Sequence, residues 1–147
     1  MKKLFYLMVL ALMPMFLTAC SDDDDEPTGV ENAESLYGTW QQTNGYAFED
    51  GAKHHEKSVS ADEAEYLKFD TDGTCSVHGG ERGHFDDVRS SYSFVFNQEE
   101  KVLKIGQTTF VVDALSGGIL KLKDEYKKDE YVMVTYKKVS NSVWDNL

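Results

Sequence analysis

The chain has 147 residues, 28% of them charged, and a formal net charge of −11 with two cysteines. This length suits one domain with a core of its own. The negative charge disfavours nucleic acid and anionic lipid surfaces as partners, because both carry negative charge themselves.

The first 19 residues are typical of a cleaved leader. Lys2 and Lys3 precede an apolar run over residues 4–16. A helix that spans a bilayer needs about 20 apolar residues, so this run is too short to serve as one. It is also apolar on every side, whereas a helix packed on a core has a polar face. We therefore predict a secretory signal peptide over residues 1–19.

The motif LTAC at residues 17–20 resembles the lipobox of bacterial lipoproteins. The resemblance implies cleavage before Cys20, a diacylglycerol group on its sulfur and acyl chains of the palmitate type. Two or three such chains anchor a protein stably, whereas a single short chain holds only marginally. Loss of the leader also removes Lys2 and Lys3, so the formal charge falls from −11 by two to −13.

An acidic stretch, SDDDDEPTGVENAES, occupies residues 21–35. It has almost nothing to bury, so we predict a disordered tether over residues 20–35, extended by repulsion between its acids. A flexible acidic run supplies charge without a preorganised cage, which disfavours a metal site. The run Asp22–Glu26 resembles the export signal that follows the lipidated cysteine in surface-exposed lipoproteins of Bacteroidetes. That resemblance implies a lipid-anchored protein of the outer membrane, exposed on the cell surface.

From Leu36 onward the chain consists of short segments with alternating apolar and polar residues. This period of two predicts seven or eight strands after Gly38, in YGTWQQT, EYLKFD, TCSVH, SSYSFVF, VLKI, TTFVVDAL, ILKLK and YVMVTYKKV. The stretches DTDG and NQEEK predict tight turns, and only SADEAEY, with Ser60 and Glu63 at capping-box spacing, indicates a turn of helix. We predict an all-β antiparallel meander over residues 36–147 that closes into an up-and-down barrel of about eight strands. A sandwich of two sheets is the alternative.

Three of these segments, LYGTW (36–40), YLKFDTDGTCSV (66–77) and VTYKKV (134–139), resemble the lipocalin-like domains of Bacteroidetes lipoproteins. The match to the Gly-x-Trp signature of lipocalins lies at Gly38 and Trp40. The resemblance implies that Trp40 plugs one end of the barrel, beneath a basic residue of the last strand. Lys137 or Lys138 could take that place, although lipocalins generally use arginine there.

The sequence offers few residues for redox or metal chemistry. If Cys20 is acylated, Cys75 has no disulfide partner, and with no basic neighbour to activate it we expect a small buried hydrophobe. Asp70, Asp72 and Glu81 have the spacing of a calcium loop, but Cys75 stands where that loop needs glycine. The histidines lie in segments that we predict to be exposed loops, which disfavours a zinc site; they are His54, His55, His78 and His84.

Catalysis has no candidate residues either. Cys75 and His78 fall on opposite faces of a regular strand, and the chain has no Gly-x-Ser-x-Gly elbow. The many carboxylates are explained by an acidic surface. We therefore predict a protein that is not an enzyme and uses no cofactor or metal.

What remains is the interior of the barrel, which can be filled by side chains or hold one small ligand. Alternation places on one face Trp40, Leu67, Phe69, Tyr92, Phe94, Phe96, Phe110, Val112, Leu120, Leu122, Val132, Val134 and Tyr136. The candidate residues for lining a pocket or filling the core are Trp40, Phe69, Tyr92, Phe94, Phe96, Phe110 and Tyr136. Two hypotheses stay open: a module that binds a small apolar or amphipathic ligand, and an accessory with a solid core that docks to an outer-membrane protein. A third hypothesis, a metal-dependent enzyme, has the least support from the sequence.

Overall fold

A computed structural model describes residues 29–80, 84–85 and 89–147 of the chain. The predicted signal peptide, the lipidation site Cys20 and the acidic run Asp22–Glu26 lie outside the described residues, as does Glu81. No helix in the described ranges is long and apolar enough to cross a membrane.

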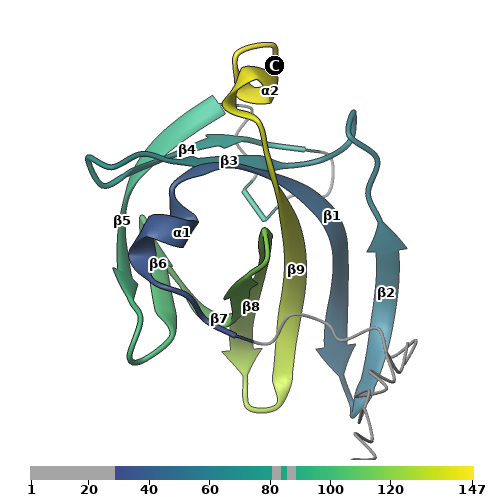
Figure 1. Cartoon of the computed structure of the whole chain (residues 1–147). Coiled ribbons are helices and arrows are strands. Elements are labelled where there is room, and N and C mark those ends of the chain that lie inside the picture. Colours follow the sequence, from purple (N-terminus) through teal and green to yellow (C-terminus); the bar gives the residue numbers. More distant parts are fainter. Residues whose placement is uncertain (1–28, 81–83, 86–88) are drawn as a thin grey trace, which may run out of the picture.

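The described chain is almost entirely β-structure, in one antiparallel sheet of nine strands whose neighbours follow the sequence nearly in order (Figure 1). The strands are β1 (Gly38–Glu49), β2 (Ala52–Ser58), β3 (Tyr66–Phe69), β4 (Thr74–His78), β5 (Arg89–Asn97), β6 (Val102–Ile105), β7 (Thr108–Ser116), β8 (Ile119–Lys127) and β9 (Glu130–Val139). An additional pairing of β1 with β9 closes the sheet into a ring. The prediction of an all-β meander that closes into a lipocalin-like up-and-down barrel is therefore confirmed.

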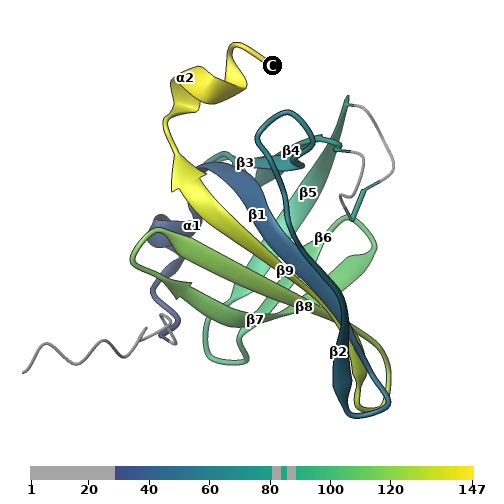
Figure 2. The ribbon, with the colours of Figure 1, turned by 90° about the vertical axis from the view of Figure 1, so that its right-hand side faces the viewer.

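The twelve-residue strand β1 organises the closure. Along one edge, residues 39–48 pair with β9. Along the other edge, residues 38–41 pair with β3, and residues 44–49 pair with β2. Eight strands thus form the ring, and β2 extends the sheet where β1 runs past the end of β3. Figure 2 shows β2 and the turn between β8 and β9 together at the lower right, away from the first helix.

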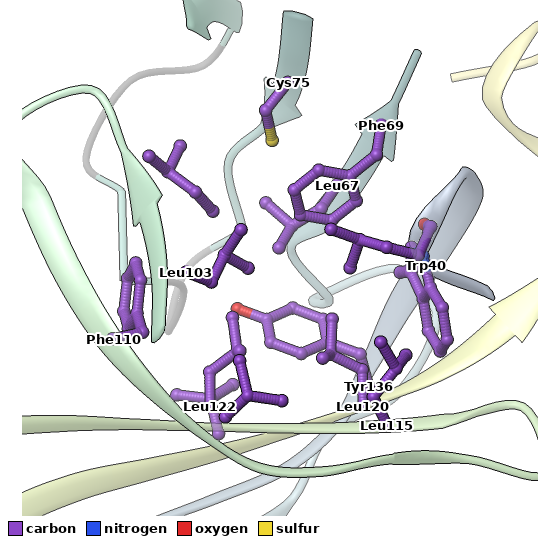
Figure 3. Close-up of a cluster of buried hydrophobic side chains, with 14 of the residues drawn as sticks. Trp40, Leu67, Phe69, Cys75, Leu103, Phe110, Leu115, Leu120, Leu122 and Tyr136 are labelled. Atoms are coloured by element: carbon purple, nitrogen blue, oxygen red, sulfur yellow. The ribbon is translucent and has the colours of Figure 1, made fainter. Parts of the chain in front are cut away.

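The interior is built by the alternation that the sequence shows. Strand β5 is the simplest case, because its residues alternate along its whole length between exposed and half-buried. Inward residues of seven ring strands form one hydrophobic cluster, against which the half-buried aromatic side chains of β5 pack. Each large apolar side chain that is fully buried in this way contributes about 1.5–3 kcal/mol to stability. Figure 3 shows Tyr136 in the middle of this cluster, with Trp40 at one side.

Two four-residue helices, which the sequence pattern does not predict, lie at one end of the barrel: α1 (Ala33–Leu36) and α2 (Asn141–Trp144). Each begins after a capping residue, Asn32 or Ser140, whose side chain accepts a hydrogen bond from a backbone N–H of the helix. The sequence assigns residues 20–35 to a tether, whereas residues 29–35 are packed against the barrel. The expected helical turn after Ser60 is a tight turn, in which the Glu63 N–H donates to the Ser60 carbonyl at 3.2 Å.

Strand β2 also departs from the prediction, which places His54 and His55 in a loop. Six of its seven residues are exposed, so it lacks the alternation of a half-buried strand and takes its conformation from pairing with β1. His55 has φ 56° and breaks the regular pairing between the two strands.

The end of the barrel that carries both helices is called the Trp40 end. The Trp40 indole Nε1 donates to the Leu36 carbonyl at 2.7 Å, which ties the buried ring to α1. Of the two lysines proposed from the sequence, Lys138 takes the place over the ring, with its Nζ 5.3 Å from the ring centroid. The same Nζ donates to the Ser35 carbonyl at 2.9 Å.

Candidate functional site

A groove of about 230 Å³ lies where β1 passes from pairing with β3 to pairing with β2. This region, with the turns between β1 and β2 and between β8 and β9, is called the groove end, and it lies opposite the Trp40 end (Figure 2). The groove is lined by Gln42, Gly45, Tyr46, Ala47, His55, Lys57, Val59, Val132 and Val134.

The sequence makes this space by placing small residues next to the core. Val134 belongs to the hydrophobic cluster and Val132 packs against it. The facing positions of β1 carry Gly45, paired with Val134, and Ala47, paired with Val132. Glycine and alanine fill little of the volume that larger side chains occupy elsewhere in the barrel. The result is a largely apolar surface with Lys57 and His55 beside it.

A buried carboxyl group lies behind this surface. Glu65 precedes β3 and is fully buried. Its Oε1 accepts a hydrogen bond from the Tyr136 hydroxyl at 2.7 Å, and its Oε2 accepts one from the Phe85 N–H at 2.9 Å. Burial raises the pKa of Glu65, and hydrogen bonds from Phe85, Tyr136 and the His84 backbone oppose that rise. Burial, followed by the charge of Glu65, raises the pKa of Tyr136 well above its ordinary value.

Gln42 connects the carboxyl to the groove. Its side-chain Oε1 accepts from the Glu65 N–H at 3.1 Å, and its backbone N–H donates to the Glu65 carbonyl at 2.9 Å. Gln42 is itself buried and lines the groove. A molecule in the groove would therefore meet an apolar wall with one amide side chain that is held by the Glu65 backbone.

Sequence reasoning missed Glu65, although a signal was present. In the segment EYLKFD, Glu65, Leu67 and Phe69 alternate, so a strand that includes Glu65 turns all three side chains to the same face. Because Glu65 is charged, the sequence pattern favours an exposed residue at the end of the strand. Three donors, from Tyr136, Phe85 and His84, allow the carboxyl to be buried instead.

The seven candidate residues from the sequence all lie in or against the core. Trp40, Phe69, Phe110 and Tyr136 are each 1% exposed, whereas Tyr92, Phe94 and Phe96 are half-buried and pack against the cluster. Phe69 and Phe94 meet edge to face, with ring centroids 5.0 Å apart. The groove is lined by none of the seven but by Val132 and Val134, from the same predicted inward face.

Several residues considered for metal or thiol chemistry lie in other settings than the sequence predicts or have structural roles. His78, which the sequence pattern predicts in an exposed loop, is the last residue of β4 and is half-buried. Asp72 Oδ1 accepts from the Thr74 N–H at 2.9 Å, and Gly73 has φ 86°, which together form the predicted hairpin turn. Burial raises the pKa of the Cys75 thiol. His84 Nε2 lies 3.3 Å from Asp124 Oδ2. In the described part of the chain, no group of three or more histidine, cysteine, aspartate or glutamate side chains is placed to hold a metal ion.

The geometry defines the class of the protein as a closed, lipocalin-like up-and-down barrel with a packed core and an apolar groove at one end. No protein-family model and no curated protein matches the chain. Among solved structures, a mutant of the fluorescent protein UnaG is similar over 74% of this chain and 99% of its own, with 14% sequence identity and a TM-score of 0.44.

Proposed function

We propose that the chain is a Bacteroidetes-type lipoprotein, anchored in the outer membrane through Cys20 and exposed on the cell surface. In this proposal its barrel binds one small apolar or amphipathic ligand and performs no catalysis. The lipobox resemblance and the acidic run Asp22–Glu26 support the anchor and the export. The groove at the end of β1 supports the binding.

The apolar lining of the groove is the observation that carries the ligand proposal. The groove exposes an apolar surface to water, formed by Ala47, Val59, Val132 and Val134. A ligand that covered this surface would gain about 25 cal/mol of binding free energy for each Å² of apolar area removed from water. Lys57 and His55 lie beside it and can donate to the polar end of an amphipathic molecule. The volume of about 230 Å³ lies below the roughly 300–1,000 Å³ of pockets that take drug-sized molecules, which limits the ligand to a small one.

The test fills the groove and measures binding of an apolar fluorescent probe such as anilinonaphthalene sulfonate to the chain beginning at Ser21. We expect Ala47→Trp to weaken binding by roughly tenfold or more, about 1.4 kcal/mol, with a smaller loss for Ala47→Leu. Val95→Trp is the matched control, because Val95 is 68% exposed on β5. Equal binding by all four proteins would contradict a site in the groove.

A second candidate function is a structural accessory of an outer-membrane assembly, and the filled interior favours it. The ring of Tyr136 and the indole of Trp40 occupy the space that a ligand takes in an open barrel. This candidate gains support if no small molecule or probe binds and a membrane protein instead cross-links to the wild-type surface in cells. If Ala47→Trp abolished that cross-link, the groove would be the surface that contacts the membrane protein.

The anchor and the export signal have separate tests. Cys20→Ala should abolish incorporation of a labelled fatty acid, and replacement of Asp22–Asp25 by alanine should protect the protein from protease added to whole cells. Full cleavage after the alanine replacement would mean that the acidic run acts only as a spacer.

A further inference from the structure

We infer that the anchored barrel stands with its Trp40 end toward the bilayer, so that the groove opens away from the membrane and takes its ligand from the surrounding medium. This inference rests on the proposed lipid anchor at Cys20. It follows from where residues 29–31 are attached to the barrel and from how few residues separate Gly29 from Cys20.

Residues 29–31 are fixed to the edge of β7. Val30 forms a parallel bridge with Leu115. The Leu115 N–H donates to the Gly29 carbonyl at 2.8 Å, and the Glu31 N–H donates to the Leu115 carbonyl at 2.8 Å. Leu115 is 1% exposed and belongs to the hydrophobic cluster, so residues 29–31 are bound to a rigid part of the barrel.

The following residues continue this attachment at the Trp40 end. Glu31 Oε1 accepts from the Gly117 N–H at 3.4 Å, in the turn between β7 and β8. Asn32 caps α1, and Lys138 Nζ holds the Ser35 carbonyl. Figure 2 shows α1 and the turn between β7 and β8 at the left, with β2 at the opposite side of the molecule. The chain from the anchor therefore meets the barrel at the end farthest from the groove.

The reach of the anchor decides the orientation. Residues 21–28 separate Cys20 from Gly29, and nine steps of at most about 3.3–3.6 Å span roughly 30 Å. Strand β1 has 12 residues, which at about 3.3 Å each extend for roughly 40 Å, or about 30 Å along the axis of a barrel whose strands tilt by about 40°. Turning the groove to the bilayer would require a fully stretched connection laid along the wall. The five acids of Asp22–Glu26 would then lie against an acidic molecule, which repels them.

Charge does not decide between the two orientations. The turns of the Trp40 end expose Asp72, Glu99 and Glu100, and those of the groove end expose Glu49, Asp50 and Asp129, so anionic headgroups repel both ends alike. Three lysines of the groove end are also paired with glutamates: Lys53–Glu56 at 3.8 Å, Lys57–Glu63 at 3.8 Å and Lys127–Glu130 at 2.7 Å.

The experiment measures energy transfer from a dye on the lipidated full chain to an acceptor lipid in vesicles. One variant, Glu99→Cys, carries the dye in the turn between β5 and β6 at the Trp40 end. The matched variant, Lys128→Cys, carries it in the turn between β8 and β9 at the groove end. Cys75 is fully buried and its thiol pKa is raised, so the parent chain should take up no dye.

We expect transfer from position 99 to exceed transfer from position 128 by roughly twofold or more, because the two turns are separated by about the length of the barrel. Equal transfer, or greater transfer from position 128, would overturn the inference. Insertion of a Gly/Ser segment of about 20 residues after Glu26 should reduce the difference, because it lengthens the reach beyond the barrel. An undiminished difference would show that the connection does not set the orientation.

The mass of the purified full chain distinguishes failure of the orientation from failure of the proposed lipid anchor. A mass without acyl groups would overturn the anchor and the orientation together, while the groove would still be tested by Ala47→Trp. An acylated chain with equal transfer from both positions would overturn the orientation alone.

Discussion

At the scale of single residues, the buried Glu65 carboxyl makes the stability of the barrel depend on pH. Burial raises its pKa, so the folded chain binds this proton more readily than the unfolded chain. The contribution of this proton to stability is complete below the unfolded pKa and is lost as pH rises through the folded pKa. Ionised Glu65 keeps its three donors but bears the cost of desolvation.

We therefore predict that Glu65→Gln has a flatter stability profile than the wild type as pH rises from 4.5 toward neutrality. Urea unfolding at several pH values measures this, with Glu99→Gln as the control at an exposed carboxyl. The wild type should lose stability relative to Glu65→Gln across this window. A parallel pair of profiles would mean that Glu65 does not change its protonation between the folded and unfolded chain there.

The second prediction concerns the Tyr136 hydroxyl, which donates a hydrogen bond to Glu65. Tyr136→Phe keeps the ring but leaves the carboxyl with one donor fewer, and a lost hydrogen bond to a buried group costs about 1–3 kcal/mol. The urea midpoint at neutral pH should fall accordingly. Tyr131→Phe, at a half-buried tyrosine of the same strand, should change the midpoint far less. Equal shifts for both variants would contradict the role of the Tyr136 hydroxyl.

Lys138 offers a comparison with the residue next to it. Lys138→Met removes the charge over the Trp40 ring and the hydrogen bond to Ser35, and we expect a loss of about 1–2 kcal/mol in unfolding free energy. Lys137→Met should be nearly neutral, and Lys138→Arg should keep most of the stability. If both methionine variants were equally neutral, the lysine would contribute nothing to the plug.

At the scale of elements, the connection that follows β4 packs closely on the segment before β3. A Cβ added at Gly80 would lie 2.3 Å from the Glu63 carbonyl oxygen and 2.5 Å from the Ala64 carbonyl carbon. Backbone atoms cannot move aside as a flexible side chain can, so Gly80→Ala should cost at least about 1–3 kcal/mol by overpacking. Gly29→Ala is the control, because its Cβ would make only contacts of 3.8 Å with Ser116. Thermal unfolding of both variants measures the difference, and equal midpoints would contradict this packing.

The elements also show what could be predicted from the sequence. The inward face that contains Leu67, Phe69 and Phe94 follows from a period of two, which is a local property of the chain. The hairpin at Gly73 follows from its turn residues. Strand β2 could not be predicted in this way, because its exposed residues have no apolar pattern and its pairing depends on β1.

The groove lies beyond local prediction for a related reason. It exists because β1 runs past β3 and pairs with β9 through an irregularity between Gln42 and Asn44. That register is set by contacts between strands far apart in the sequence. Alternation places Val134 on the inner face, but it does not show that Gly45 and Ala47 stand opposite β9. The same limit applies to Glu65, whose partners come from β9 and from the segment that contains Phe85.

At the scale of the whole molecule, the barrel has three parts along its axis. Residues 29–35 attach at the Trp40 end, the packed core fills the middle, and the groove opens at the other end. The chain from Cys20 onward has a formal charge of −13, so in the proposed anchored form we expect the acyl chains alone to attach it to the membrane.

We therefore predict that the chain beginning at Ser21 does not bind vesicles, even those rich in anionic lipid at low salt, because like charges repel. Flotation of vesicles with the unlipidated chain measures this, and the lipidated chain is the positive control. Binding of the unlipidated chain to anionic vesicles would mean that a protein surface also contacts the membrane.

The central claim, that this barrel binds a small ligand in the groove beside Val132 and Val134, is tested most directly by native mass spectrometry. The chain beginning at Ser21 is secreted, purified without detergent and weighed intact, beside Ala47→Trp and Val95→Trp. We expect an added mass of one small molecule on the wild type and on Val95→Trp that is absent from Ala47→Trp. The bare protein mass in all three samples, after incubation with an extract of apolar small molecules, would contradict it.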